Sequence, residues 1–289
     1  MKKDDIFYRN QNHIGRIYAY HGKTDTSIEL YKSLLKNEND IEKHTLSKIY
    51  LNFGNTYEDI RENDLSLEYF NKSLKICEES KDEDMIAKIQ RCIGIVMMNT
   101  GQFDKAMECY KKHMDHFQKS NNKVEIAIIA GQIGAIYLHQ GKLEDAYKFF
   151  EKQHQICKEL DSKQLLQQAL GNMALINNIQ GKYESALGKF DEILTICEDI
   201  NDRINLANTY GNLGIAYKNL EDYPRAIENY ELQLQIAEKS NYKRHICSAY
   251  TNMGVSYHKK GEFENSDNYY QKSEEIVLKI NDKIFSKSI

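Results

Sequence analysis

Proline is nearly absent from this sequence of 289 residues, which contains Pro224 alone. Because proline interrupts helix interiors and marks long loops, its scarcity indicates helices joined by short turns. The sequence has no tryptophan, and its 15 glycines mostly fall at regular intervals. No apolar run reaches the roughly 18 residues of a transmembrane helix, and residues 1–10 lack the apolar stretch of a secretory signal.

An excess of charge of one sign is also missing. The 39 basic and 43 acidic residues are interleaved along the chain and leave a formal net charge of −4. A nucleic-acid-binding protein needs a basic face that neutralises phosphates, so we expect no nucleic-acid partner. The sequence also lacks Gly-x-Ser-x-Gly, His-Glu-x-x-His and Gly-Lys-Ser/Thr motifs. We therefore predict a non-enzyme without a cofactor.

What the sequence does contain is a repeat of 40 residues (39 between the first two copies). A small column comprises Gly15, Gly54, Gly94, Gly134, Ala174, Gly214 and Gly254. Seven positions later, a turn column comprises Gly22, Arg61, Gly101, Gly141, Gly181, Glu221 and Gly261. Twelve positions later stand small residues, namely Ser27, Ser66, Ala106, Ala146, Ala186, Ala226 and Ser266. Sixteen positions later stands an aromatic column, namely Tyr31, Phe70, Tyr110, Phe150, Phe190, Tyr230 and Tyr270.

Each column has a physical reason in a pair of helices. A small residue in the first helix allows the second helix to approach closely, and the turn column ends the first helix where a left-handed backbone is often needed. A small residue and an aromatic four positions apart lie on one face of the second helix. In the sixth repeat this pattern predicts helices over about 203–219 and 223–239, with Pro224 in the first turn of the second helix.

The pattern resembles the tetratricopeptide repeat over residues 10–280, although the family's usual unit is about 34 residues and its closing proline is absent here. Segments such as 210–217 and 250–257 look like the long-repeat branch of G-protein-signalling modulators, rapsyn and kinesin light chains. The resemblance implies an all-α, right-handed superhelical solenoid of seven helix-turn-helix repeats. Residues 1–9 would form an N-terminal tail, and residues 281–289 a short remnant of a further helix.

In this family the first helices form a concave wall that receives a partner peptide or helix. Two positions before the small column, five repeats carry a carboxamide. This amide ladder comprises Asn52, Gln132, Asn172, Asn212 and Asn252. A side-chain amide both donates and accepts, so the ladder could hold the main chain of a peptide. The alternative is that these amides bond neighbouring helices to one another.

Charged positions near the ends of the first helices offer a second candidate surface. Glu58 and Asp59 stand in the second repeat, whereas the last two repeats carry Lys218, Asn219 and His258. An acidic start and a basic end of the groove would orient a charged partner. The alternative is a solvated helix end with incidental charges.

We predict that the six cysteines are reduced residues of the core, without a role in metal binding or catalysis. Cys77, Cys157 and Cys197 share one column with Ala237 and Val277, which indicates a small apolar core position. A separate cluster of Cys109, His113 and His116 lies on one face of a helix at a spacing that could bind a metal. We predict no metal site, because a single helix with three ligands and no partner motif is usually coincidental.

Three functions fit a repeat array. The first is a protein-protein interaction scaffold or adaptor that binds a partner peptide or helix in the groove. The second is a fixed structural subunit of a larger cytoskeletal or ciliary complex. The third is a ligand-sensing regulator similar to the bacterial peptide-responsive repeat proteins, which we rank last because the first repeat begins by about residue 10 and leaves no room for an effector. Because the sequence shows neither a secretory signal nor a membrane span, we expect a cytoplasmic protein, associated with the cytoskeleton or a cilium in the second case. At the carboxyl end, we expect the uncovered side of the last helix to be covered in one of two ways. Either the apolar residues fold back over it, namely Ile284, Phe285 and Ile289, or a partner protein binds there.

Overall fold

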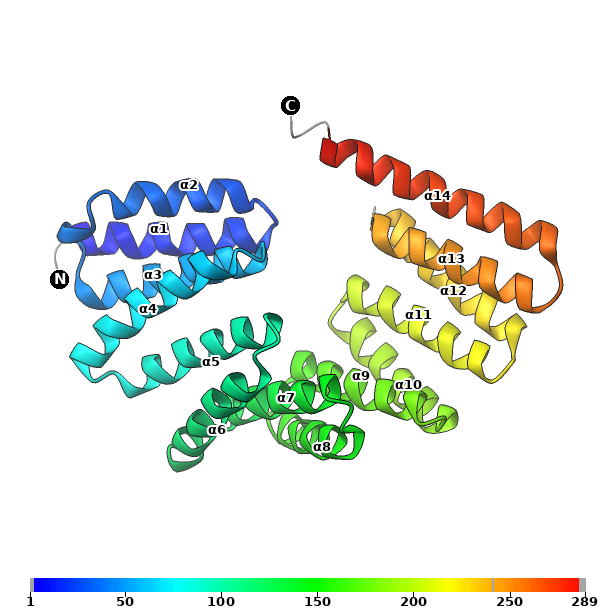
Figure 1. Cartoon of the computed structure of the whole chain (residues 1–289), viewed down its shortest axis with the longest axis horizontal. Helices are drawn as coiled ribbons and strands as arrows, with labels where there is room; N and C mark the ends of the chain where they lie inside the picture. The colour runs from blue at the N-terminus through cyan, green and yellow to red at the C-terminus, as the bar shows by residue number, and fades with distance from the viewer. Residues whose placement is uncertain (1–2, 241, 286–289) are drawn as a thin grey trace. The chain divides into compact units, whose positions relative to one another are not determined.

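The computed structural model describes the backbone of residues 3–240 and 242–285, and every regular element in that part of the chain is helical. The helices are drawn in chain order in Figure 1. The α-helices of this part are α1 (Lys3–Tyr20), α2 (Thr24–Leu35), α3 (Lys43–Asp59), α4 (Asn63–Ser80), α5 (Glu83–Asn99), α6 (Phe103–Lys119), α7 (Lys123–His139), α8 (Leu143–Glu159), α9 (Lys163–Ile179), α10 (Tyr183–Asp199), α11 (Arg203–Asn219), α12 (Tyr223–Lys239), α13 (Lys243–Lys259) and α14 (Phe263–Phe285). A short 3-10 helix, Glu38–Asp40, follows α2. The predicted all-α class is confirmed, and α11 and α12 have the predicted bounds.

The chain forms two compact units, Met1–Lys142 with α1–α7 and Leu143–Ile289 with α8–α14. Within each unit, every helix contacts the next helix along the chain. First helices of successive repeats also contact each other, as α1 with α3 and α3 with α5 in the first unit and α11 with α13 in the second. Contacts confined to near neighbours in the sequence are the pattern of a repeat solenoid.

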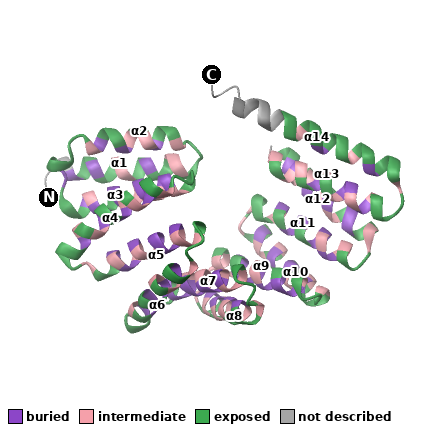
Figure 2. Ribbon diagram, viewed as in Figure 1, coloured by how far each residue is buried: buried purple, intermediate pink, exposed green. Residues whose placement is uncertain are grey.

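The small column holds the two helices of a repeat close together. A methyl group built on Gly54 would lie 2.6 Å from the Phe70 ring, and one on Gly94 would lie 2.6 Å from the Tyr110 ring. These rings therefore fill the space that a side chain on the first helix would otherwise occupy. Figure 2 shows buried residues on the sides of the helices that face their neighbours, with exposed residues on the outer sides.

The aromatic column is the centre of this core. The rings of the first six repeats are buried almost completely. Tyr270, in the seventh repeat, is 39% exposed, because α14 is the last described helix and one of its sides is not covered by another. Each buried ring contributes roughly 2–3 kcal/mol of hydrophobic stabilisation.

The turns confirm the predicted left-handed column at the end of the first helices. All seven residues of the turn column have positive φ angles, including Arg61 at 64° and Glu221 at 61°. A second left-handed column, which the sequence did not predict, lies between the second helix and the next repeat. It comprises Lys81, Asn121, Asp161 and Asn201.

Nineteen positions after the small column, the second helices carry a floor column of buried residues. It comprises Leu34, Ser73, His113, Gln153, Ile193, Gln233 and Ser273. The serine hydroxyls find local partners, as Ser73 Oγ donates to the carbonyl oxygen of Ser47 at 2.7 Å. His113 Nε2 is buried and has no hydrogen-bond partner among the residues that the structure describes, and burial lowers the pKa of this imidazole to about 4. The floor column is therefore polar in most repeats but differs chemically from one repeat to the next.

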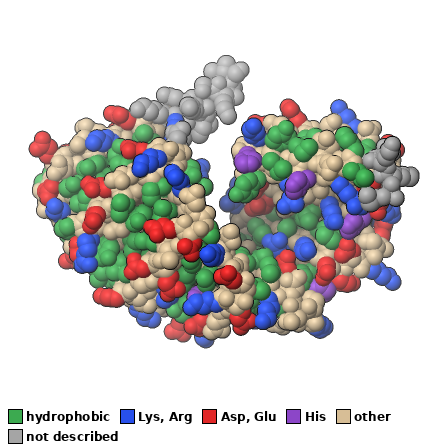
Figure 3. All heavy atoms as spheres, turned by 180° about the vertical axis from the view of Figure 1, so that it is seen from behind, with side chains coloured by type: hydrophobic (Ala, Val, Ile, Leu, Met, Phe, Trp, Pro, Cys, Tyr) green, Lys and Arg blue, Asp and Glu red, His purple; other side chains and the backbone are tan. Residues whose placement is uncertain are grey.

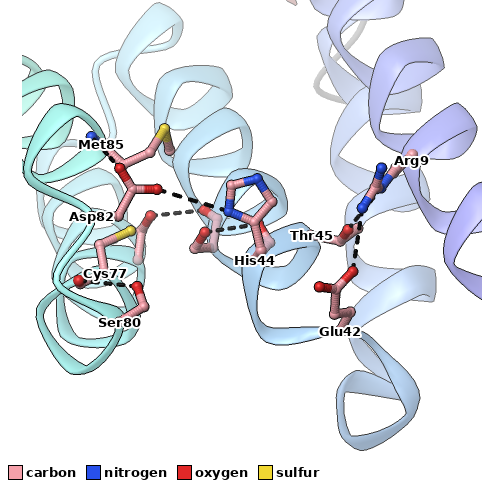
Figure 4. A network of polar contacts seen from close by, with 10 residues as sticks. Arg9, Glu42, His44, Thr45, Cys77, Ser80, Asp82 and Met85 are labelled. Carbon is pink, nitrogen blue, oxygen red and sulfur yellow. Dashed lines mark hydrogen bonds and ion pairs between the residues drawn. The ribbon is translucent and has the colours of Figure 1, made fainter. Parts of the chain in front are cut away.

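Residues 3–9 are helical as part of α1, although we expected a tail over residues 1–9. Asp5 on α1 is buried, and its Oδ1 accepts a hydrogen bond of 2.6 Å from Thr45 on α3. Arg9 Nε lies 2.7 Å from Asp5 Oδ2, and Arg9 Nη2 lies 3.3 Å from Glu42 Oε2. Figure 4 shows the side chain of Arg9 directed towards Thr45 and Glu42, with which it forms hydrogen bonds. This network ties the first turns of α1 to the second repeat.

A similar tie joins the second repeat to the third. His44 Nδ1 on α3 lies 3.9 Å from Asp82 Oδ2 (Figure 4). Asp82 caps α5, because its Oδ1 accepts a hydrogen bond of 3.1 Å from the backbone nitrogen of Met85. Asp82 thus both accepts a hydrogen bond from a backbone N–H group at the start of α5 and contacts the preceding repeat.

At the carboxyl end, α14 continues as one helix to Phe285. We had expected residues 281–289 to begin a further helix. Residues 281–285 instead extend α14. The side chains of Ile284 and Phe285 and all of Ile289 lie outside the described residues, so their expected role in covering the end of the array is not tested.

No helix in the described part of the chain is long and apolar enough to cross a bilayer. On the face drawn in Figure 3, acidic and basic side chains are interspersed. This agrees with the interleaved charges of the sequence.

Two glycines of the first helices make a matched test of the close packing. We expect Gly54→Ala to lower the free energy of unfolding by about 1–2 kcal/mol, because overpacking against Phe70 outweighs the better helix propensity of alanine. Gly171→Ala should instead raise it by up to about 1 kcal/mol, because the nearest atom, Ile193 Cδ1, is 4.0 Å away. Chemical denaturation measures both, and equal effects of the two variants would contradict this packing.

The buried imidazole of His113 predicts a pH dependence of stability. Its pKa falls from 6.5 to about 4 on folding, so its contribution is complete above pH 6.5 and is lost as the pH falls towards 4. We expect His113→Gln, which installs the residue found at Gln153 and Gln233, to reduce the slope of stability against pH in this window by about 1 kcal/mol per pH unit. The exposed His21, changed to Gln, is the control, and an unchanged slope in H113Q would contradict the interpretation.

Candidate functional site

Two adjoining hollows lie on the first helices of the second unit. The first hollow, of about 610 Å³, lies between α9 and α11. Its lining residues are Gln164, Leu165, Gln167, Gln168, Gly171, Asn172, Leu175, Asn178, Phe190, Ile193, Asn205, Asn208, Thr209 and Asn212. The second hollow, of about 200 Å³, lies between α11 and α13. It is lined by Asn208, Gly211, Asn212, Ile215, Gln233, Arg244, His245, Ser248 and Asn252. Asn208 and Asn212 line both hollows, so we treat the two as one groove.

Carboxamides dominate the first hollow. Eight of its fourteen lining residues are asparagine or glutamine, and none carries a charge. Helical periodicity explains the concentration, because Gln164, Gln168 and Asn172 are four residues apart on α9, and Asn205, Asn208 and Asn212 follow one face of α11. A wall of this kind offers many donors and acceptors without selecting a charge.

Two glycines open the groove onto the second helices. Gly171 and Gly211 stand three positions before the small column, and each lines a hollow. Below Gly171 the floor is apolar, with Phe190 and Ile193 among the lining residues. Below Gly211 the floor is polar, because the amide of Gln233 lies about 3 Å from the position that a methyl on Gly211 would take. We call Gly171 and Gly211 the window glycines.

Several amide oxygens in the groove lack a hydrogen-bond partner within the described residues. Gln167 donates from Nε2 to Cys197 Sγ at 3.0 Å, which leaves its buried Oε1 unpaired. Asn178 Oδ1 in the first hollow and Gln233 Oε1 in the second are also buried and unpaired. A buried acceptor without a partner is costly, and a ligand N–H group would relieve that cost.

A histidine orients the amide shared by the two hollows. His245 Nε2 and Asn208 Oδ1 are 2.8 Å apart. With the imidazole proton on Nε2, Asn208 accepts through its oxygen and leaves its NH₂ group for a ligand. Burial lowers the pKa of His245, so this imidazole is neutral at physiological pH and the contact is a neutral hydrogen bond.

The amide ladder has different surroundings in the two units. Asn172, Asn212 and Asn252 line the groove of the second unit. In the first unit, Asn52 Nδ2 donates to Asn12 Oδ1 at 2.9 Å, which is the bonding between neighbouring helices that we set out as the alternative. Gln132 on α7 is half-buried and does not line either hollow.

Asn52 also lines a hollow of about 340 Å³ between α1 and α3. His13, Arg16, Ile17, Ala19, Tyr20, Asn55, Thr56 and Asp59 complete its lining. Burial raises the pKa of Asp59. This hollow has both charges and fewer amides, so its chemistry differs from that of the groove.

The predicted charged positions lie away from the groove. Lys218, Asn219 and His258 stand at the ends of α11 and α13 and line neither hollow. Asn219 and His258 are exposed, and the His258 ring meets the Phe263 ring edge to face at 5.2 Å. Their predicted role in partner binding is not tested by this arrangement.

The structure does not assemble the metal candidates. His113 is buried with a depressed pKa, whereas His116 Nε2 lies 3.2 Å from Asp84 Oδ1. Cys109 is half-buried, and burial raises the pKa of its thiol. Among the described residues, no group of three or more histidine, cysteine or acidic side chains could hold a metal ion.

Sequence reasoning missed several residues of the groove. The wall also contains Gln164, Gln168, Asn205 and Asn208, and the polar floor is Gln233. The helical repeat offered a signal for the wall, because Gln168 and Asn208 stand one turn before Asn172 and Asn212. The window glycines were also visible, because Gly131, Gly171 and Gly211 form a column of their own.

Comparison with known proteins agrees with this architecture. The tetratricopeptide repeat model matches residues 85–159, 125–199 and 165–239, and a second model of that repeat matches 248–276. The RNPP family C-terminal domain matches residues 6–90. No curated protein sequence matches the chain.

Three solved structures have the same fold over nearly the whole chain. The apo form of RapI has 17% identity and a TM-score of 0.71, covering 95% of this chain and 99% of its own. The apo quorum sensor NprR from B. thuringiensis has 16% identity and a TM-score of 0.66, covering 96% and 89%. The Rap conjugation gene regulator of plasmid pLS20, in complex with the Phr* peptide, has 16% identity and a TM-score of 0.65, covering 92% and 72%.

At 16–17% identity, these structures show a shared fold but not a shared function. None of the three is a G-protein-signalling modulator, rapsyn or a kinesin light chain, so the resemblance to that branch gains no support from them. The repeat model spans residues 85–239, more than half of the 289 residues. The chain therefore belongs to the tetratricopeptide repeat family.

Proposed function

We propose that this chain is a non-catalytic peptide-binding module, and that the groove of α9, α11 and α13 holds the main chain of an extended peptide. The observation that carries the proposal is the composition of the first hollow, with eight carboxamides among fourteen lining residues and no charge. A peptide main chain alternates N–H donors and C=O acceptors. Side-chain amides match both kinds of group without regard to the peptide's sequence.

Unpaired acceptors in the groove support the same ligand. Gln167 Oε1, Asn178 Oδ1 and Gln233 Oε1 are buried and lack partners in the described part of the chain, and the backbone N–H groups of a peptide would supply them. Asn208 offers the complementary donor, because His245 occupies its oxygen. Donors and acceptors on the two sides of one groove suit a strand-like ligand better than a helix, whose main-chain groups are already paired.

The groove offers few groups for acid–base chemistry, and the imidazole among them, His245, is already hydrogen-bonded to Asn208. No ionisable side chain lines the first hollow, and the second contains only Arg244 and His245. Because general acid–base catalysis needs a positioned proton donor or acceptor, this supports binding without reaction.

The comparisons support a peptide-sensing regulator over the two other functions that we considered. NprR is a quorum sensor, and the pLS20 regulator was solved in complex with the Phr* peptide. We therefore raise the ligand-sensing alternative, which the sequence placed last, to the leading proposal for the cellular role. A fixed subunit of a cytoskeletal or ciliary complex draws no support from the comparisons. All six cysteines are free, which suits a reducing cytoplasmic location.

The test begins with a displayed library of short random peptides, selected against the intact chain, with affinities measured by calorimetry. We expect the triple variant Asn172→Ala, Asn212→Ala and Asn252→Ala to weaken the selected peptides by about 30- to 1,000-fold. Three hydrogen bonds lost at about 1 kcal/mol or more each account for this range.

The matched control is the triple alanine variant of Gln235, Asn268 and Gln271, which are exposed on α12 and α14 and line neither hollow. It should bind as the parent chain does. Selection of no peptide, or equal binding by both triple variants with unchanged circular dichroism, would refute a peptide site in this groove.

A further inference from the structure

The two hollows of the groove differ in the chemistry of their floors, and this difference bears on which peptide binds. The inference rests on the proposed function, because it assigns the side chains of the same peptide. Phe190 and Ile193 form the floor of the first hollow, beneath Gly171. Gln233 forms the floor of the second, beneath Gly211.

The first hollow suits an apolar side chain. Leu165 and Leu175 stand on its wall above the apolar floor, and Leu175 is 45% exposed although it is a large hydrophobic residue. Gly171 leaves the opening free, since the nearest atom to an added methyl is Ile193 Cδ1 at 4.0 Å. A ligand side chain placed here would remove both Leu175 and its own apolar surface from water.

The second hollow suits a carboxylate. Gln233 is only 3% exposed, and its buried Oε1 has no hydrogen-bond partner among the described residues. The Nε2 of the same amide lies beneath Gly211, 2.8 Å from the position of an added methyl group. Arg244 is exposed on the rim of this hollow and forms no ion pair with any described residue. Neither aspartate nor glutamate lines either hollow.

Charge and hydrogen bonding therefore point in the same direction. Among the described residues no acidic side chain forms an ion pair with the guanidinium of Arg244, and the NH₂ groups of Gln233 and Asn208 line the same hollow as donors. A carboxylate accepts from all three kinds of group, whereas a ligand ammonium would be repelled by Arg244. The first hollow has an uncharged wall, and the second contains the cation Arg244. This difference in charge would fix the orientation of a peptide along the groove, with its carboxylate in the second hollow.

We propose that the peptide bound in this groove carries an apolar side chain, seated over Phe190 and Ile193, and a carboxylate, seated at Gln233 and Arg244. The carboxylate belongs either to an aspartate or glutamate side chain or to the peptide's own carboxyl terminus. Both sources present the same group to the protein.

The experiment compares peptides selected by the parent chain and by charge-reversed variants of it. For peptides selected by the parent chain, we expect Arg244→Glu to weaken binding by about 10- to 100-fold, because it replaces a charge-assisted contact with repulsion. Peptides in which the acid is replaced by lysine should bind R244E more tightly than the parent. Lys239→Glu makes the same change of charge at an exposed position on α12 that lines neither hollow, and it should leave affinity unchanged.

Exchanging the floor residues tests the second element of the proposal. Gln233→Ile installs the residue that the fifth repeat has at the same column, so the fold should tolerate it. Peptides selected by Q233I should replace the acid with an apolar residue. Amidated and free-acid versions of each selected peptide then distinguish the sources, because only a terminal carboxylate is lost on amidation.

The outcomes separate this inference from the proposed function. If the amide triple variant loses binding while R244E binds as the parent does, or if the selected peptides share no carboxylate, the groove binds peptides and the carboxylate assignment is wrong. If the parent selects no peptide at all, both proposals are wrong.

Discussion

The contact between a small residue on one helix and an aromatic ring on the next is the constraint on which the rest of this structure depends. At Gly54 and Gly94 the rings of Phe70 and Tyr110 occupy the space of a missing side chain. That contact fixes the distance and rotation of the two helices in each repeat. Because it recurs every 40 residues, it also fixes which faces of the first helices remain available for other purposes.

The groove of the second unit is a consequence of that fixed rotation. The window glycines and the amides of the ladder stand three and two positions before the small column, so they lie in a constant phase relative to the buried ring. The first helices supply the wall of amides, and the second helices supply the floor. The residues that line the groove and the residues that pack the helices are thus adjacent in sequence but lie on different faces.

The repeated elements could be predicted from the sequence, because each column reflects a contact made in the same way in every repeat. The helix bounds of the sixth repeat and the burial of the rings from Tyr31 to Tyr230 follow from that regularity. The exceptions could not be predicted. The helical turns at residues 3–9 depend on Asp5 meeting Thr45, and Asn52 pairs with Asn12 although its column neighbours Asn172 and Asn212 line a groove. Gln233 was missed because its importance depends on Gly211, a residue from another helix.

The floor column contains leucine, serine, histidine, glutamine and isoleucine at equivalent positions of one chain. The fold therefore tolerates chemically unlike side chains at the point that lies beneath a window glycine in the groove. A single codon change there alters what lies under the groove and leaves the wall, the turns and the aromatic column intact. If the groove binds a peptide as we propose, a change in the floor column would alter which side chain the groove accepts while the solenoid keeps its shape.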